Sequence, residues 1–195
     1  MRVVGLNSSE VADAVRDGHL EAALVVLPVD DRALEVSPIA WTSEAVYLSL
    51  DPARTRRPVT AADLGRAQLI VAEARWGSAD PTRRQLLERV QGEGVSLRPV
   101  VEVESSAAAL ALAARGVGDT IISLPLATHL GYTERLHWVS LEPPLHEHFA
   151  VITRRGAHLS PATRVLIQMA TEHLKRLRPS RPLRGGRNGR PGRGR

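Results

Sequence analysis

Residues 104–125 (ESSAAALALAARGVGDTIISLP) constrain the fold of this chain more than any other stretch. Ser105 or Ser106 can cap a helix, because a serine oxygen accepts a hydrogen bond from the unpaired amides of the first helical turn. Residues 107–114 are strong helix formers and continue the helix. Gly116 suits the left-handed residue at which helices commonly end. The first half of the stretch therefore predicts a short helix and a tight turn.

The second half of the same stretch predicts a buried strand. Gly118 lets the backbone turn tightly. Residues 120–124 are apolar enough to be buried on both faces of a sheet, and Pro125 ends the run. A strand reached from a helix in this way is typical of an α/β unit with a parallel sheet. We therefore expect an α/β fold.

Periodicity and turn residues predict the remaining elements. Further helices are expected at residues 8–16, 59–64, 81–91, 127–130 and 161–177. Strands are expected at residues 2–5, 19–27, 34–39, 44–50, 68–72, 97–103, 120–124, 136–139 and 148–153. Asn7 or Ser8, Thr60 and Asp80 are the expected caps of three of these helices.

The opening stretch resembles the second regulatory lobe of the LysR-type transcriptional regulators. The shared positions are a serine, an alanine, two glycines and a Leu-Pro pair, here Ser106, Ala113 or Ala114, Gly116, Gly118, Leu124 and Pro125. VTAADL at 59–64 and LSPATRVLIQMATEHL at 159–174 also resemble segments of that family. The resemblance covers residues 2–177. It implies an effector-binding (substrate-binding) domain with a two-lobed, type II periplasmic-binding-protein-like fold and a hinge.

The resemblance also implies how the chain is divided. Residues 1–46 and 146–177 correspond to lobe I, and residues 47–145 correspond to lobe II. The family's N-terminal helix-turn-helix has no counterpart here, and lobe I lacks its first strand and helix. In the related fold that strand pairs with the two strands expected at 2–5 and 19–27. We therefore expect an N-terminally truncated member whose reading frame extends upstream of Met1.

Composition separates the folded part from the tail. Residues 178–195 carry seven arginines and no acidic residue, and removing them from the net charge of +5 leaves −2 for residues 1–177. This Arg-, Gly- and Pro-rich tail predicts disorder. There is no cysteine, no apolar run long enough to span a membrane and no signal-peptide core at the N-terminus. We expect a cytoplasmic protein without a membrane contact.

Two expected helix starts are candidate effector sites. Asn7, Ser8 and Ser9 precede one helix, and Ser105 and Ser106 precede another. Free amides and the helix dipole attract a carboxylate at such a position. If the two starts converge from the two lobes, they favour a small anionic ligand. The alternative is that these side chains only cap their helices.

A loop after the strand at 68–72 is a third candidate effector site. Ligands of open α/β sheets bind beyond the carboxyl ends of the strands. There Glu73, Arg75 and Trp76 offer a carboxylate, a guanidinium group for a bidentate pair and an apolar cover. Arg83, on the next helix, is expected to face solvent. The alternative is an ordinary surface loop.

His146 and His148 flank Glu147, and alternate residues of a strand share a face. Two histidines on one face could grip a metal ion, but the spacing indicates no third ligand. A solvated strand edge explains the pattern without a metal. No nucleophile elbow, P-loop or dinucleotide fingerprint occurs either. We therefore expect no metal, no cofactor and no enzymatic activity.

The resemblance implies a domain that senses a small, anionic metabolite between its lobes and controls transcription without altering the ligand. Family members act as homo-oligomers on DNA, but this chain alone is not expected to bind a specific DNA site. One alternative is a stand-alone solute-binding protein. The other is a protein that binds nucleic acid non-specifically through the arginines of its tail.

Overall fold

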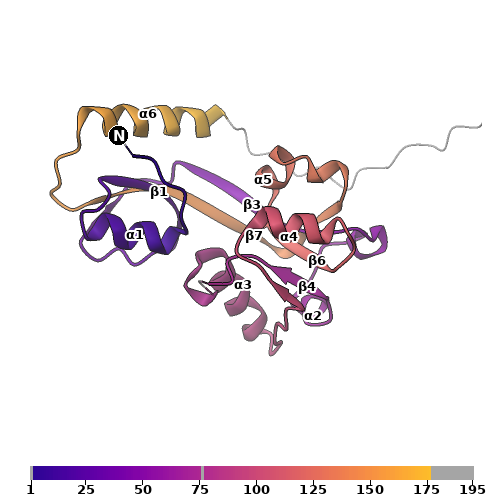
Figure 1. Ribbon diagram of the computed structural model, residues 1–195. Helices are drawn as coiled ribbons and strands as arrows, with labels where there is room; N and C mark the ends of the chain where they lie inside the picture. The colour runs from indigo at the N-terminus through magenta and orange to yellow at the C-terminus, as the bar shows by residue number, and fades with distance from the viewer. Residues whose placement is uncertain (1, 76, 177–195) are drawn as a thin grey trace, which may run out of the picture.

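The computed structural model describes residues 2–75 and 77–176. The tail at 178–195, and with it the expectation of disorder, lies outside the described residues. Figure 1 shows an elongated molecule in which two long strands, β3 (Trp41–Ser49) and β7 (His137–Arg154), run between two groups of helices. The architecture is the two-lobed α/β fold expected from the sequence. The expected lobe boundaries near 46 and 146 fall within these two strands and stay a prediction.

One mixed sheet runs through the molecule in the order β1-β7-β3-β6-β4-β5, with β2 also paired to β7. The strands beside β3 and β7 are β1 (Ala22–Leu27), β2 (Leu34–Val36), β4 (Leu69–Val71), β5 (Val101–Glu102) and β6 (Asp119–Ser123). β1, β2 and β3 are antiparallel to β7, and β3 is antiparallel to β6. β4 is parallel to β5 and β6, as the opening stretch predicts.

The opening stretch folds as expected, into helix α4 (Ser106–Ala113) followed by β6. The Ser105 hydroxyl accepts from the amide of Ala108, which caps the helix. Gly116 has a φ of +77°, the left-handed conformation that a side chain disfavours. At Gly118 an added Cβ would lie 2.5 Å from the carbonyl oxygen of Gln68. A glycine is therefore needed where β6 begins beside β4.

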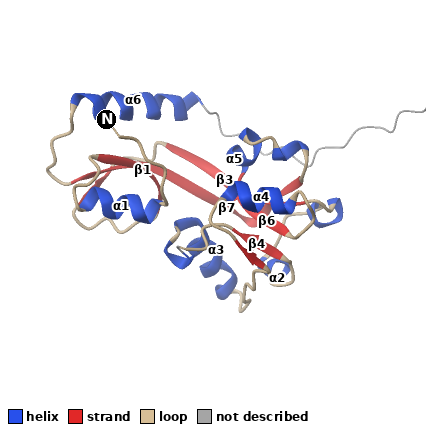
Figure 2. Cartoon of the chain, in the orientation of Figure 1, coloured by secondary structure: helices blue, strands red, loops and turns tan. Residues whose placement is uncertain are grey.

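Helices cover both faces of the sheet at the end that contains β4, β5 and β6 (Figure 2). Helices α2 (Ala61–Leu64) and α3 (Pro81–Gly92) contribute Leu64, Leu86 and Val90 to an apolar cluster with Tyr47 and Leu69. Helices α4 and α5 (Leu124–His129) contribute to a second cluster, which contains the fully buried residues Val46, Leu48, Ile70 and Leu110. This end is therefore a three-layer unit.

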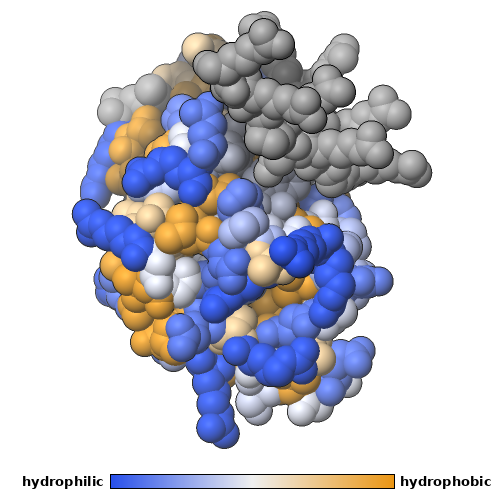
Figure 3. Space-filling model, turned by 90° about the vertical axis from the view of Figure 1, so that its right-hand side faces the viewer, coloured by the Kyte–Doolittle hydropathy of each residue, from blue (hydrophilic) through white to orange (hydrophobic). Residues whose placement is uncertain are grey.

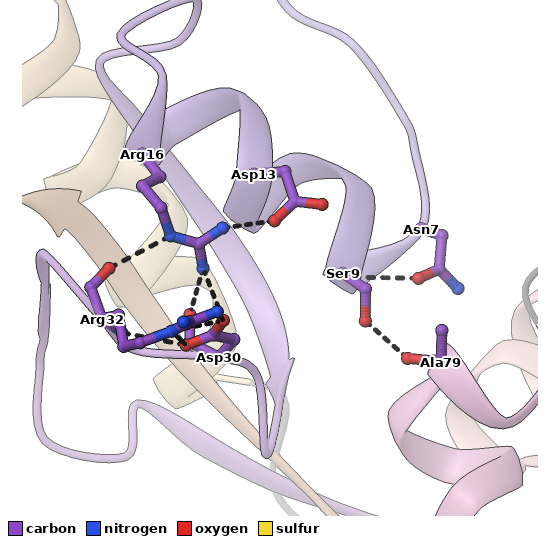
Figure 4. Close-up of polar contacts among 7 residues, drawn as sticks. All are labelled: Asn7, Ser9, Asp13, Arg16, Asp30, Arg32 and Ala79. Carbon is purple, nitrogen blue, oxygen red and sulfur yellow. Dashed lines mark hydrogen bonds and ion pairs between the residues drawn. The ribbon is translucent and has the colours of Figure 1, made fainter.

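The other end has one smaller cluster. Helix α1 (Ser8–Arg16) packs Val11, Ala12 and Val15 against Val25, Leu34 and Ile152 of the sheet. Arg16 holds the far end of α1 to the following loop, since its guanidinium group donates to Asp13 and to the carbonyl oxygen of Asp30 (Figure 4). Helix α6 (Pro161–Arg176) lies above β1 in Figure 1.

Two strand predictions are wrong. Residues 2–5 form no strand, and β1 pairs with β7 alone among the described residues. The segment pairs with no strand of the described residues, so its apolar residues lack the ladder that makes a strand. The strands expected at 136–139 and 148–153 are parts of one strand, β7.

The continuity of β7 has a structural cause. Ala45 of β3 pairs with Leu145, whereas the next residue, Val46, pairs with Ser140. Residues 141–144, which include Pro143 and Pro144, are therefore left over in a bulge. Their backbone turns to Val59, whose amide donates to Ser140 and whose carbonyl accepts from Glu142. The prolines interrupt no ladder bond because they lie where the ladder shifts.

Figure 3 shows the surface at the right-hand end of Figure 1. Hydrophobic side chains appear there in small patches separated by hydrophilic ones. Mixed surfaces of this kind are usual for folded domains, whose exposed area is about half apolar.

Candidate functional site

A cavity of about 480 Å³ lies where the first turns of α1, α3 and α4 approach the start of β3 and the second half of β7. Its walls are mostly apolar, and two of the apolar side chains, Trp41 and Phe149, are aromatic. The other large apolar lining residues are Leu6, Val26, Val71, Leu86, Ile121, Ile122 and Leu126. Its polar lining residues are Asn7, Ser8, Glu73, Asp80, Thr82, Arg83, Ser106, Ser123, His129 and Glu147. Its size and largely apolar lining are typical of small-molecule sites.

The start of α1 forms one side of this cavity. Asn7 caps the helix, since its Oδ1 accepts from the amide of Ser9 at 2.9 Å. Its Nδ2 donates to Glu73 Oε2 and to Asp80 Oδ2, each at 3.0 Å. Ser8 Oγ accepts from the amide of Val26. Asn7 therefore ties α1 to the loop after β4 and to the start of α3.

Ser9 has a different position from its two neighbours. Its hydroxyl donates to the carbonyl oxygen of Ala79 at 2.5 Å and does not line the cavity (Figure 4). The bond adds a second tie between α1 and the segment before α3. Asn7 and Ser8 do line the cavity, as the effector-site prediction requires.

The loop after β4 contributes Glu73. Its φ is +59°, an uncommon conformation for a residue with a side chain. Burial raises the pKa of the Glu73 carboxyl, while the amide of Asn7 acts in the opposite direction. Arg75, in the same loop, is exposed and is not among the lining residues. Trp76 lies outside the described residues, so its predicted role and that of Arg75 stay predictions.

The start of α4 meets the same cavity through one of its two serines. Ser106 lines the cavity, and Ser105, which caps the helix, does not. The expected convergence of two helix starts on one space is therefore present in the structure. The side chains of Asn7 and Ser105 already accept from first-turn amides of their helices, so these amides need no ligand. Ligand binding at either helix start stays a prediction.

Arg83 is not at the solvent-facing position expected for it. Its side chain is only 16% exposed and lines the cavity. The guanidinium group donates to Glu102 Oε2 at 2.5 Å. The sequence holds the signal that was missed: Arg83 precedes Leu86 by three residues and Val90 by seven, which places it on the apolar face of α3.

Glu147 is a site residue that the sequence reasoning did not select. It is 6% exposed and lies on the cavity wall. Its Oε1 accepts from the Thr82 hydroxyl at 2.8 Å, and its Oε2 has no hydrogen-bond partner in the described part of the chain. Burial raises the pKa of this carboxyl, with smaller opposite effects from the hydroxyls of Thr82, Ser123 and Ser43.

The two histidines beside Glu147 lie away from this cavity. Their rings are stacked with centroids 6.5 Å apart, and Thr42 Oγ1 hydrogen-bonds His148 Nδ1 at 3.1 Å. No group of three or more metal-ligating side chains occurs among residues 2–75 and 77–176. The pair therefore lacks the further ligand that a metal site needs.

No helix in the described part of the chain is long and apolar enough to cross a membrane.

Over residues 1–175 the sequence matches the family described as LysR substrate binding domain. A search of curated proteins found no match. The fold is similar to that of the CcmR regulatory domain of Synechocystis PCC6803, in complex with 2-PG. The TM-score is 0.73 at 17% identity, over 88% of this chain and 81% of that chain.

Two further structures extend the likeness. The effector binding domain of QuiR in complex with shikimate has a TM-score of 0.71 at 13% identity, over 88% of this chain and 79% of that one. Full-length CbnR, complexed with its target DNA, has a TM-score of 0.63 at 15% identity. The match covers 88% of this chain and 57% of CbnR. At these identities the likeness establishes the fold.

Proposed function

The chain belongs to the LysR substrate binding domain family, and from this membership we propose that it senses a small-molecule effector in the cavity bounded by Asn7, Glu73 and Ser106. One observation supports the position: the cavity lies between the two ends of the sheet, with α1 on one side and α3, α4 and α5 on the other. A ligand there touches both ends at once, so it can favour one relative orientation over another.

The proposed role is regulatory. The domain binds and releases the effector without altering it chemically. Effector binding changes how the domain acts on a DNA-bound, homo-oligomeric regulator in the cytoplasm. Base-specific DNA contacts would come from a groove-binding element, which this family domain does not itself supply. The oligomer, the target DNA and the compartment belong to this proposal.

A matched pair of substitutions tests the site. Leu126 lines the cavity and is 37% exposed, whereas Leu130, just after the same helix, is 40% exposed and outside the lining. Thermal shift of the full chain against a panel of organic acids, amines and sugars identifies ligands. We expect Leu126→Trp to abolish each hit by filling the cavity and Leu130→Trp to preserve it. Hits that survive Leu126→Trp, or an empty panel, would overturn the proposal.

A further inference from the structure

The charged groups of the cavity determine which ligand it can accept, and the inference drawn from them rests on the proposed function. Three carboxylate side chains, Glu73, Asp80 and Glu147, line the cavity together with one guanidinium group, that of Arg83. A cavity with this charge distribution repels an anion and attracts a cation.

All three carboxylates accept hydrogen bonds from the protein, and Glu73 and Asp80 share the same donor. Asn7 Nδ2 donates to Glu73 Oε2 and Asp80 Oδ2, and the backbone amide of Arg83 donates to Asp80 Oδ1. Arg83 does not offset the remaining charge, because its guanidinium group is held by Glu102. Asn7, Asp80 and Arg83 are therefore already engaged within the protein, and Glu73 is engaged through Oε2.

Glu147 is different because the carboxyl oxygen that accepts no hydrogen bond is buried. Thr82 satisfies Oε1, but Oε2 is buried and unpartnered within the described residues. Ser43 and Ser123 lie near enough to lower the pKa of the carboxyl, but they hydrogen-bond each other at 2.8 Å and neither is a hydrogen-bond partner of Oε2. Burying such an atom is costly unless a donor reaches it. Glu147 lines the cavity, and a bound molecule can supply that donor.

The surroundings of Glu147 suit an organic cation. Trp41 and Phe149 form an aromatic wall of the same cavity, with ring centroids 5.1 Å apart. Aromatic faces attract positive charge and also pack against the apolar body of a ligand. A neutral hydroxyl could donate one hydrogen bond to Oε2, but only a cation also balances the buried negative charge.

We propose that the cavity takes a ligand with a positively charged nitrogen group, an ammonium or amidinium, whose N–H donates to Glu147 Oε2 while its apolar part packs on Trp41 and Phe149. The expectation of an anionic ligand came from the helix starts at Asn7 and Ser106. The Glu147 end of the same cavity selects the opposite charge.

Three probes of similar shape test this inference by calorimetry on the full chain: 2-phenylethylamine, 2-phenylethanol and 3-phenylpropanoate. We expect the amine to bind at least about tenfold more tightly than the alcohol, the typical value of a charge-assisted hydrogen bond, and the carboxylate to bind most weakly. Glu147→Gln should remove the preference for the amine. Glu88→Gln, on an exposed position of α3, should leave it unchanged.

The outcomes separate the two proposals. Equal or tighter binding of the alcohol or the carboxylate by the unaltered chain would overturn the inference, and this comparison needs no variant to fold. An amine preference that persists in Glu147→Gln would also overturn it. If organic acids bind in a Leu126-dependent way and amines do not, the effector-sensing function stands and only the ligand class is wrong. If nothing binds in the cavity, both fail.

Discussion

The two ends of the sheet differ in how much apolar surface they bury. At the end with β4 and β6, apolar clusters lie on both faces, and Leu48, Ile70 and Leu110 are completely buried. At the end with β1, a single smaller cluster lies between α1 and one face of the sheet, with Val15 and Ile152 as its completely buried members. The cavity between them therefore has one firm wall and one that relaxes more easily.

The difference matters for sensing. A ligand can shift a conformational equilibrium only if part of the protein has a second conformation of similar free energy. The less tightly packed end is the part with such freedom, since local stability follows buried apolar contacts. Four predictions test this comparison, in order of decreasing effect.

The largest effect should come from the doubly covered end. Leu48→Ala leaves a cavity in a fully buried position between two packed layers, so we expect a loss of about 2–5 kcal/mol in the free energy of unfolding. Urea denaturation measures it. Leu130→Ala, at an exposed position after α5, is the control and should cost under about 1 kcal/mol. Similar losses for both would show that this end is not the rigid part.

Next is the link between the two ends. Asn7→Asp keeps the oxygen that caps α1 but replaces the donating NH2 group by a third carboxylate beside Glu73 and Asp80. We expect a loss of roughly 1–3 kcal/mol at neutral pH, from two lost hydrogen bonds and like-charge repulsion.

Acid should reverse part of that loss. Lowering the pH protonates one of the clustered carboxyls and relieves the repulsion, and burial already raises the pKa of Glu73. Unfolding curves for Asn7→Asp and the unaltered chain should therefore approach each other between pH 7 and 4.5. A constant difference across this range would show that the charges do not interact.

A smaller and opposite effect should come from Glu147. Burial raises the pKa of this acid above its ordinary value of 4.5, so the folded state holds the proton more tightly than the unfolded state. The protonated carboxyl stabilises the folded state fully at pH values below the pKa of the unfolded chain. The free energy of unfolding then falls as the pH rises through the pKa of the folded state. Glu147→Gln carries no such penalty.

The measurement follows from that sign. Glu147→Gln should match the unaltered chain near pH 4 and be the more stable of the two above the folded pKa. Urea denaturation at several pH values between 4 and 8 measures this difference. A variant that is less stable at every pH would mean that the carboxylate is fully satisfied without a ligand.

The smallest effect compares identical changes at the two ends. Val46 and Val15 are both completely buried, Val46 in β3 at the doubly covered end and Val15 on the face of α1 that packs against the other end of the sheet. Truncation costs more where the surroundings cannot collapse around the gap. We therefore expect Val46→Ala to cost about 0.5–1 kcal/mol more than Val15→Ala. Equal costs in urea denaturation would remove the contrast between the two ends.

Elements with local signals were predicted well. Caps at Asn7, Thr60, Asp80 and Ser105 all form, because a cap is made by residues within three positions of each other. Strands were harder, because they depend on distant partners. Residues 2–5 have strand-like composition but join no ladder, and the two strands expected at 136–139 and 148–153 are one strand with a bulge held by Val59.

Several residues that line the cavity were selected from the sequence, and Glu147 on its wall was not. Helix starts at Asn7 and Ser106 do meet one cavity, since they follow from the α/β pattern. Glu147 was read only with its flanking histidines, although alternation places it on the face of Leu145 and Phe149. Its burial depends on Thr82, which is 65 residues away, and one sequence does not reveal such a contact.

The paired strands β3 and β7 carry a mechanical consequence. Within residues 2–75 and 77–176 the chain passes from one end of the sheet to the other twice, once in each of these strands. A hydrogen-bonded pair resists stretching along its length but twists readily, and here the ladder shifts register at Ala45 and Val46. We therefore expect β3 and β7 to twist about their length, most easily at the register shift near Ala45 and Val46. Ligand binding would then rotate one end of the molecule relative to the other and leave the distance between the two ends almost unchanged.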